Sequence, residues 1–389
     1  MKIYFRILSF PKNLNKIFFK NKNNKMFIAL FLILLGFFST ASHFISVYRS
    51  GGNGWAIGEW LINYNGGFVR RGLIGQLIVL SNLKGNALLI LVFTLQLTLL
   101  SIIWVYLIFK LIKFRFSWTS ILVVLHPCGL LMISWDQYLF VRKEIMGLSA
   151  LILLILSFRS FRYQKIILLA SFALYLVSIF SSEVNIFIGP IFLYVLWNNR
   201  TKSKNIIYLF LVLFLISMLM AFLGAINFSG TLAQSVAICH KIQELSLNTE
   251  TNCGGAVDMI GKSLSEATNQ LNANLPENLL FLIVLIVAII PILSTDWAAK
   301  NKFFIVLTIS SVLPLFFIAW DYGRWLFLII IILSIFYDED PTKESSVKPF
   351  SGYFVVIFVL FFGVGHTNNI LSNGWIAAVP MLFNFFQNF

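Results

Sequence analysis

The chain has 389 residues, of which 59% are hydrophobic and 11% are charged. A soluble globular domain of this size would not tolerate such a composition on its surface, so we interpret the chain as an integral membrane protein. Its net charge of +14 does not indicate nucleic-acid binding, because no basic and aromatic binding module accompanies it and most Lys and Arg lie in short loops between apolar runs.

The chain begins with a basic segment, residues 1–25, which contains seven Lys and Arg and precedes an apolar run over 26–47. A cleaved signal peptide is one interpretation of this pattern. The apolar run is long, however, and no small-residue cleavage site follows it cleanly, so we expect an uncleaved first span. The basic segment is then a cytoplasmic tail, because positive residues concentrate on the cytoplasmic side of membranes.

Apolar runs of about the length of one span recur along the rest of the chain. They lie at 87–112, 117–135, 145–158, 206–226, 279–293, 303–320, 325–337 and 353–365, and a short amphipathic piece covers 73–83. The last segment, 375–389, is either a short twelfth helix or an interfacial one. These runs predict an all-α, polytopic membrane protein with about 11 transmembrane helices (10–12), which form a single membrane domain over residues 26–389.

The apolar run over 166–197 has an unusual length. Its 32 residues would measure about 48 Å as one helix, which is too long for one span and too short for two full spans. We therefore expect two abbreviated helices that meet at Ser181, Ser182 and Glu183.

The predicted topology has two substantial external loops, at 48–72 and 227–277, and an acidic cytoplasmic loop at 338–348. Most of the 29 Lys and Arg then lie inside, as orientation rules require. Cys239 and Cys253 lie fourteen positions apart in the second external loop, where they could form a disulfide. Zinc binding would need further ligands, and the local sequence offers hardly any beyond His240.

Charged residues gather in the outer connections of this topology. They are Glu59, Arg70, Arg71, Asp136, Arg142, Lys143, Glu144, Glu183, Asp321 and Arg324. Short spans would place several of them below the membrane surface, where an ionisable group is costly unless it is paired or lines a wet cavity. The pattern therefore predicts a functional cavity.

The segment GEWLINYNGGFVRRGLIG, residues 58–75, combines an acid, aromatic residues, paired glycines and two arginines. Gly66 and Gly67 can let the backbone approach a ligand closely, and the guanidinium groups of Arg70 and Arg71 suit phosphate oxygens. The alternative is that the two arginines only anchor a juxtamembrane helix to lipid headgroups. We favour the interpretation as a ligand-binding loop.

Three other segments carry charges with more than one interpretation. In VRKEIMG, residues 141–147, the carboxylate of Glu144 could bind a ligand or only stabilise the start of a helix. Glu183 has no opposite charge within ten residues, so a distant partner or a substrate must compensate it if it is buried. In DYGRW, residues 321–325, Asp321 and Arg324 could form a local ion pair or bind a charged sugar.

Tryptophan and tyrosine residues next to this last pair could stack on a sugar ring. These are Trp320, Tyr322 and Trp325. His126, in an apolar run beside Pro127, is better explained as a packed core histidine than as a ligand, and His366 as a solvated loop residue. The sequence contains no HExxH, Walker, GxSxG or dinucleotide-binding motif, so neither ATP-driven transport nor soluble-type hydrolysis is supported.

The layout resembles the GT-C superfamily of polyprenyl-phosphate-dependent glycosyltransferases. The shared features are an acid in the first external loop, an amphipathic juxtamembrane piece, short second and third external loops, and a large loop after the seventh span. The GGFVRRG, RKE and DYGRW segments also look like those of membrane proteins from bacterial surface-polysaccharide clusters, near the Wzy-type polymerases. The resemblance implies a location in the bacterial cytoplasmic (inner) membrane.

The resemblance also implies a catalytic or metal-binding role for the first-loop acid, which is Glu59 here. In many GT-C members a second acid flanks the first-loop acid, whereas none flanks Glu59. We therefore predict no metal ligands and leave a divalent cation open as a cofactor. The implied reaction transfers a glycosyl unit from a lipid-linked sugar donor to a glycan acceptor at the outer face of the membrane. Glu59 is the first candidate for the base and Glu183 the second.

The positive residues would then bind the phosphate of the donor. The substrate-binding candidates are Arg70, Arg71, Arg142, Lys143, Asp321, Tyr322 and Arg324. A transporter or flippase of sugar-lipids or anions, and a non-catalytic assembly subunit, are the alternatives. A transporter needs sites near the midplane that are reachable from both sides, whereas the charges here gather at one face, which favours the enzyme.

Overall fold

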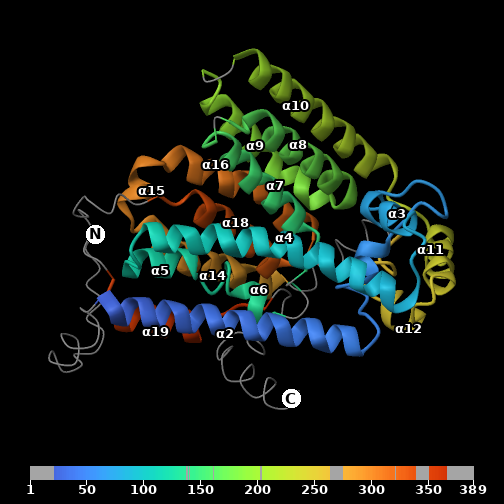
Figure 1. Ribbon diagram of the computed structural model, residues 1–389, viewed down its shortest axis with the longest axis horizontal. Coiled ribbons are helices and arrows are strands. Elements are labelled where there is room, and N and C mark those ends of the chain that lie inside the picture. Colours follow the sequence, from blue (N-terminus) through green and yellow to red (C-terminus); the bar gives the residue numbers. More distant parts are fainter. Residues whose placement is uncertain are drawn as a thin grey trace.

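The computed structural model describes residues 22–136, 139, 141–160, 162–201, 204–262, 275–319, 321–338 and 350–365. Within these ranges the regular secondary structure is entirely helical, without a strand (Figure 1). The all-α prediction is therefore confirmed for this part of the chain. The basic segment over 1–21 and the segment over 366–389, which includes His366, lie outside the described residues.

Among the described residues, four helices are long and apolar enough to cross a membrane. They are α2 (Lys22–Arg49), α4 (Gly85–Lys113), α8 (Gln164–Ser181) and α10 (Lys204–Asn227). Helix α4 has 29 residues, about 43 Å, which exceeds the hydrocarbon thickness of roughly 30 Å. Large apolar side chains on α2, α4 and α10 face outward, as lipid-facing residues do. The chain is thus a membrane protein with several potential spans.

Shorter apolar helices fill the space between the long ones. They are α7 (Glu144–Ser157), α9 (Gly189–Asn198), α16 (Lys302–Val312), α18 (Tyr322–Phe336) and α19 (Gly352–Phe361). A further apolar helix, α14 (Leu275–Leu293), has 19 residues. Helix α18 is the centre of the core, because every residue from Tyr322 to Ile335 is buried. These helices fall at the predicted apolar runs, but they are too short to establish a count of spans by themselves.

The prediction of one continuous helix over 117–135 is wrong. Helix α5 (Trp118–Val124) ends before His126, and α6 (Met132–Trp135) begins after an irregular turn. Pro127 has no amide hydrogen to donate and disfavours helical conformation at the preceding residue. The His126 ring is buried, lies 2.9 Å from the Ala288 carbonyl oxygen through Nε2, and accepts the Cys128 amide at Nδ1. His126 is thus a packed core histidine, as predicted.

A second predicted run, 303–320, is also interrupted. Helix α16 ends at Val312, and the short helix α17 (Leu315–Ile318) follows Pro314. By contrast, the predicted break in the run over 166–197 is confirmed. Helix α8 ends at Ser181, and a 3-10 helix, η2 (Glu183–Ile188), leads into α9.

The described part of the large loop after α10, residues 228–262, forms a small folded unit, called the disulfide unit below. It contains α11 (Leu232–Glu244), which begins with a capping box between Thr231 and Gln234, and α12 (Thr249–Asn252). Cys239 and Cys253 form a disulfide with their Cα atoms 5.6 Å apart, so the predicted pairing is confirmed.

This disulfide unit packs against the first connection, residues 50–72. The Asn252 side-chain amide donates to the Gly51 carbonyl (3.0 Å). A Cβ atom added to Gly54 would overlap the carbonyl oxygen of Gly254, and one added to Gly58 would overlap that of Asn252. Only glycine fits at these two positions, so the first connection and the disulfide unit form one packed layer at one end of the helices.

We expect Cys239→Ser to lower the apparent melting temperature of the detergent-solubilised protein. A cross-link over a loop of this size restricts the unfolded chain by roughly 3 kcal/mol. Thermal unfolding followed without reductant measures the difference, and reduced wild type should behave like the variant. The matched control is Cys128→Ala, which removes a buried free thiol and should leave the effect of reductant unchanged. Equal melting of oxidised wild type and Cys239→Ser would contradict the expected contribution.

Candidate functional site

Nine of the ten charged residues singled out from the sequence meet in one place. They come from the first connection, the turn before α7, the start of η2 and the start of α18. The tenth, Asp136, accepts the Leu139 amide (3.2 Å) and interacts electrostatically with His43. The sequence therefore singled out charged residues that the structure brings together, although it could not show how they pair.

Local packing fixes the position of each segment. The Trp60 indole of η1 (Gly58–Leu61) donates to the Val141 carbonyl (2.8 Å), which joins the first connection to the turn before α7. Gln96 of α4 donates to the Ala56 carbonyl (2.7 Å). The Ile74 amide, in α3 (Leu73–Val79), donates to the Ser181 hydroxyl (3.0 Å). This last bond brings Arg71 to the end of α8, next to Glu183.

Glu183 forms the outer part of the site with two arginines. Arg71 Nε lies 2.9 and 2.7 Å from the two carboxylate oxygens, and Nη2 also donates to Oε1. Arg70 Nε lies 3.8 Å from Oε1. Glu183 therefore has the distant partner that the sequence required, 112 positions away. The Glu183 side chain is 18% exposed and that of Arg70 is 36% exposed, so Arg70 is the more accessible arginine of this group.

A small pocket opens beside this group. Its lining consists of Phe68, Arg70, Arg71, Ile179, Phe180, Glu183, Ala221, Gly224 and Ala225. The last three are small residues of α10, a helix whose other side chains at this level, Phe222, Leu223 and Ile226, face outward. The pocket therefore places two arginines and a carboxylate next to an apolar outer surface.

The inner part of the site surrounds Arg324. Its Nη2 donates to Glu144 and lies 4.0 Å from Glu59 Oε1, and its Nη1 lies 3.0 Å from Asp321 Oδ2. Arg142 Nε lies 3.2 Å from Glu59 Oε2. The local ion pair between Asp321 and Arg324 was one of the two interpretations drawn from the sequence, and it is present. Glu59 is 1% exposed and does not line the pocket.

Glu144 is the residue that sequence reasoning underestimated. It is the first residue of α7, where a carboxylate commonly only stabilises the helix end. Its carboxylate instead pairs with Arg324 across 180 positions and accepts the Ser182 hydroxyl (3.4 Å). Its place among the outer charges was the only sequence signal for this role.

Several buried charged groups keep atoms without a hydrogen-bond partner among the described residues. They are Glu59 Oε2, Arg142 Nε, Glu144 Oε2 and Arg324 Nε. The contact between Glu59 and Arg142 thus has the distance of an ion pair without the angles of a hydrogen bond. Unsatisfied buried polar atoms are costly, so the inner part offers free donors and acceptors to water or to a bound polar group.

Lys143 connects the inner and outer parts. It is completely buried, and its Nζ donates to the Arg71 carbonyl (2.9 Å). Burial lowers the pKa of Lys143 to about 7, although the charge of Glu59 opposes this shift. Arg71 has a φ of 115°, a value that a residue other than glycine rarely adopts. The Lys143 bond and the two-oxygen contact with Glu183 hold Arg71 in this conformation.

Burial by itself would raise the pKa of the Glu59 carboxyl. The positive charges of Arg142 and Arg324, followed by those of Lys143 and Arg71, outweigh burial and hold the pKa of Glu59 below its usual range. Glu59 is therefore a paired carboxylate in this structure. A carboxylate that binds its cations this tightly is a weak proton acceptor. The same holds for Glu183 in this structure, because the charges of Arg71 and Arg70 outweigh burial and hold the pKa of Glu183 below its usual range.

Tyr322 and Trp325, two of the three residues expected to stack on a sugar, lie in the core. Tyr322 packs against Phe316, with ring centroids 5.7 Å apart, and the Trp325 indole donates to the Ala319 carbonyl (3.1 Å). Neither lines the pocket, and Trp320 lies outside the described residues. Over the described ranges, no group of three or more His, Cys, Asp or Glu side chains is arranged to hold a metal ion.

In comparisons with known proteins, no protein-family model, no curated protein and no solved structure matches the chain.

Proposed function

We propose that the chain is a membrane glycosyltransferase or polysaccharide polymerase with a GT-C-like layout of about 11 spans. It uses a polyprenyl-(di)phosphate-linked sugar at the outer face of the bacterial cytoplasmic membrane. The observation that carries the proposal is the pocket in which Arg70, Arg71 and Glu183 adjoin the apolar surface of α10. The composition of this site matches the chemistry of a donor with a charged phosphate and a long hydrocarbon chain.

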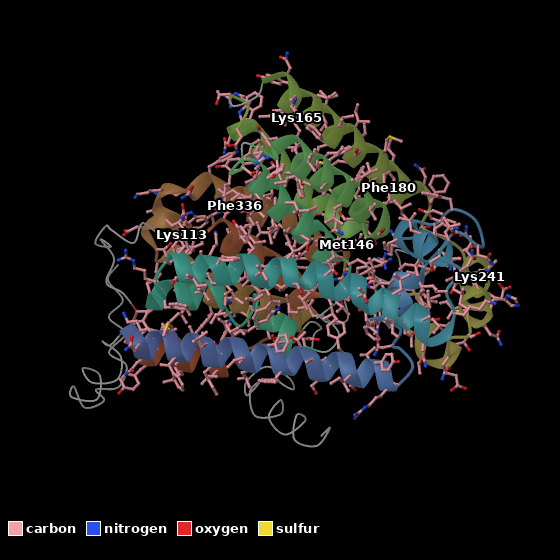
Figure 2. All side chains as sticks on the ribbon, in the orientation of Figure 1. Lys113, Met146, Lys165, Phe180, Lys241 and Phe336 are labelled. Atoms are coloured by element: carbon pink, nitrogen blue, oxygen red, sulfur yellow. A yellow bond between two sulfur atoms is a disulfide. The ribbon has the colours of Figure 1, made fainter. Side chains whose placement is uncertain are left out.

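The proposed orientation places the charge cluster and the disulfide unit outside. A disulfide forms and persists in an oxidising compartment, which supports an external position for Cys239 and Cys253. At the other end of the molecule Lys113 pairs with Asp338 (2.7 Å). Figure 2 shows Lys113 and Lys241 at opposite ends. The basic segment over 1–25 belongs inside by the same orientation rule that positions the short basic loops.

Arg70 has the properties of a first contact for the donor phosphate. It is partly exposed, lines the pocket, and is only loosely paired with Glu183. A guanidinium group can donate two parallel hydrogen bonds to phosphate oxygens. Arg71, by contrast, already donates hydrogen bonds to both carboxylate oxygens of Glu183. A phosphate that binds Arg70 and draws Arg71 away would leave Glu183 without its cations.

This exchange of partners makes Glu183 a better base when the donor is present. A carboxylate that loses nearby positive charge binds a proton more readily. In the proposed step Glu183 takes the proton of the acceptor hydroxyl, the hydroxyl oxygen bonds to the anomeric carbon of the donor, and the bond from that carbon to the phosphate oxygen breaks. The departing phosphate carries the electron pair, and Arg70 and Arg71 stabilise its charge.

We therefore give Glu183 the role of base and Glu59 a supporting role. Glu59 pairs with Arg142 and lies near Arg324, and Arg324 holds Glu144 next to Ser182, the residue before η2. The earlier expectation that Glu59 itself accepts the proton stays a prediction, and the same enzyme assay separates the two roles.

A substitution of Arg70 tests the phosphate contact. Hydrogen bonds to charged groups contribute about 1.5–3 kcal/mol, so Arg70→Gln should raise the KM for the donor roughly 10- to 100-fold with a smaller effect on turnover. The assay measures glycan product from polyprenyl-diphosphate-linked sugar by purified protein in liposomes.

The matched control is Arg200→Gln. Arg200 stacks on the Trp197 ring, with its guanidinium carbon 4.3 Å from the ring centroid, and does not line the pocket. An unchanged KM for the donor in folded Arg70→Gln would show that Arg70 does not bind the donor phosphate. Movement of the sugar-lipid across the bilayer without formation of glycan product would show that the protein is a transporter or flippase and not an enzyme.

A further inference from the structure

The disulfide unit exposes an apolar surface that its own fold does not explain. On α11, Leu232 is 73% exposed and Val236 is 63% exposed, one helical turn apart. Phe68 and Phe228, whose ring centroids lie 5.0 Å apart, are also exposed. Large apolar residues that gather on the surface of an otherwise polar unit indicate a contact with another apolar phase.

This surface continues the outward face of α10. Leu219, Leu223 and Ile226 form one exposed stripe along the last turns of α10, and Phe228 follows directly after the helix ends. The chain then turns at Gly230 and enters α11 with Leu232. Because α10 is long and apolar enough to span a membrane, its exposed stripe faces lipid, and the apolar residues of α11 begin where that stripe ends.

The direction of α11 suits a position in the plane of the membrane. Figure 1 shows α11 at one end of the molecule, where it runs across the direction of α2 and α4. The exposed stripe of α11 is apolar at Leu232 and Val236 but polar at His240, Gln243 and Glu244. His240 and Lys241 both pair with Glu244 at this end, which keeps it suited to water.

We infer that the surface formed by Leu232, Val236, Phe68 and Phe228 is an interfacial membrane-binding surface. The N-terminal half of α11 rests in the boundary between headgroups and acyl chains, and the C-terminal half with the disulfide rises into water. Interfacial helices bind in this way through a buried apolar face, and aromatic residues collect at the same depth. The partner is the bilayer in which the chain itself is inserted.

This contact would set the depth of the pocket. The Arg70 amide donates to the Phe228 carbonyl (3.0 Å), so the backbone that carries the accessible arginine is joined to the residue that enters the interface. The inference concerns the position of the disulfide unit and does not depend on glycosyl transfer.

Collision experiments with a spin label test the inference. A ketone-bearing amino acid in place of Val236, coupled to a nitroxide, avoids thiol exchange with Cys239, and the same label in place of Gln243 is the matched control. The protein is studied in nanodiscs of phosphatidylethanolamine and phosphatidylglycerol. We expect the label at 236 to collide with oxygen several-fold more than with a water-soluble nickel chelate, and the label at 243 to show the reverse. A label in place of Leu232 should behave like that at 236.

Two results would overturn the inference. Equal access of the nickel chelate to labels at 236 and 243 would place the whole of α11 in water. Protection of the labels at 232 and 236 from both oxygen and the nickel chelate would show that a protein surface, such as a second copy of the chain, covers them. Both positions are exposed, so the labelled proteins should fold normally.

Discussion

Glu183→Gln is expected to lower the turnover of glycosyl transfer by about a hundredfold or more, because general-base help typically contributes 10² to 10⁴ in rate. Glutamine keeps the size of the side chain and can still accept a hydrogen bond from Arg71, but it cannot take the proton of the acceptor hydroxyl. Product formation in liposomes at saturating donor measures the effect. The KM for the donor should change little, since Arg70 and Arg71 remain.

Two controls accompany this variant. Glu244→Gln changes a carboxylate on α11 that pairs with Lys241 and does not line the pocket, so it should keep wild-type turnover. Glu59→Gln should reduce stability more than turnover, because it leaves Arg142 with weaker compensation. Wild-type turnover in folded Glu183→Gln, together with a hundredfold loss of turnover in folded Glu59→Gln, would show that Glu59 is the base.

Arg324→Gln should be the most destabilising single change in the site. The substitution leaves Glu59, Glu144 and Asp321 near one another without the cation that they share. Removing one partner of a buried ion pair costs about 3–5 kcal/mol, because the remaining charge is left uncompensated. We expect a large fall in apparent melting temperature and in the yield of monodisperse protein, both measured after solubilisation in the same detergent.

The double variant Arg324→Gln, Glu144→Gln provides the internal check. It removes one of the uncompensated carboxylates, so part of the lost stability should return. Lys113→Gln is the matched surface control, because the pair of Lys113 with Asp338 is more than half exposed on both sides and exposed pairs contribute little. Melting of Arg324→Gln at the wild-type temperature, or a further loss in the double variant, would contradict the ion-pair explanation.

The sequence predicted the long helices α4 and α10 well, because the apolar runs over 87–112 and 206–226 contain no proline and match these helices closely. The position of the short hairpin could be predicted because run length limits the number of spans that fit, and the break falls at Ser181 and Glu183 as expected. The disulfide could also be predicted, because only two cysteines lie in the polar loop.

The interruptions in the other apolar runs were harder to predict. Pro127 and Pro314 are visible in the sequence, but proline alone does not decide whether a helix kinks, ends or continues. At His126 the outcome depends on the Ala288 carbonyl, which is 162 positions away. Apolar content therefore indicated the runs but not their breaks.

The ion-pair partners within the site could not be predicted from the sequence for a similar reason. Charge patterns in the sequence identify groups that need compensation, but the partner is set by the packing of helices. Glu183 pairs with Arg71 rather than with any neighbour in sequence, and Glu144 pairs with Arg324 instead of capping α7. The core position of Tyr322 likewise follows from the burial of α18, which no local pattern distinguishes from a lipid-facing helix.

The layer formed by the first connection and the disulfide unit has a consequence for biosynthesis. Gly51 and Asn252, which are joined in that layer, lie 201 positions apart. At a synthesis rate of roughly 5–20 residues per second, the ribosome needs about 10–40 s to reach Asn252 after Gly51. During that interval Gly54 and Gly58 lack the backbone of Gly254 and Asn252 against which they pack, and Arg324 has yet to be made. A nascent chain stalled before residue 252 should therefore expose the first connection to protease, whereas the completed chain should protect it.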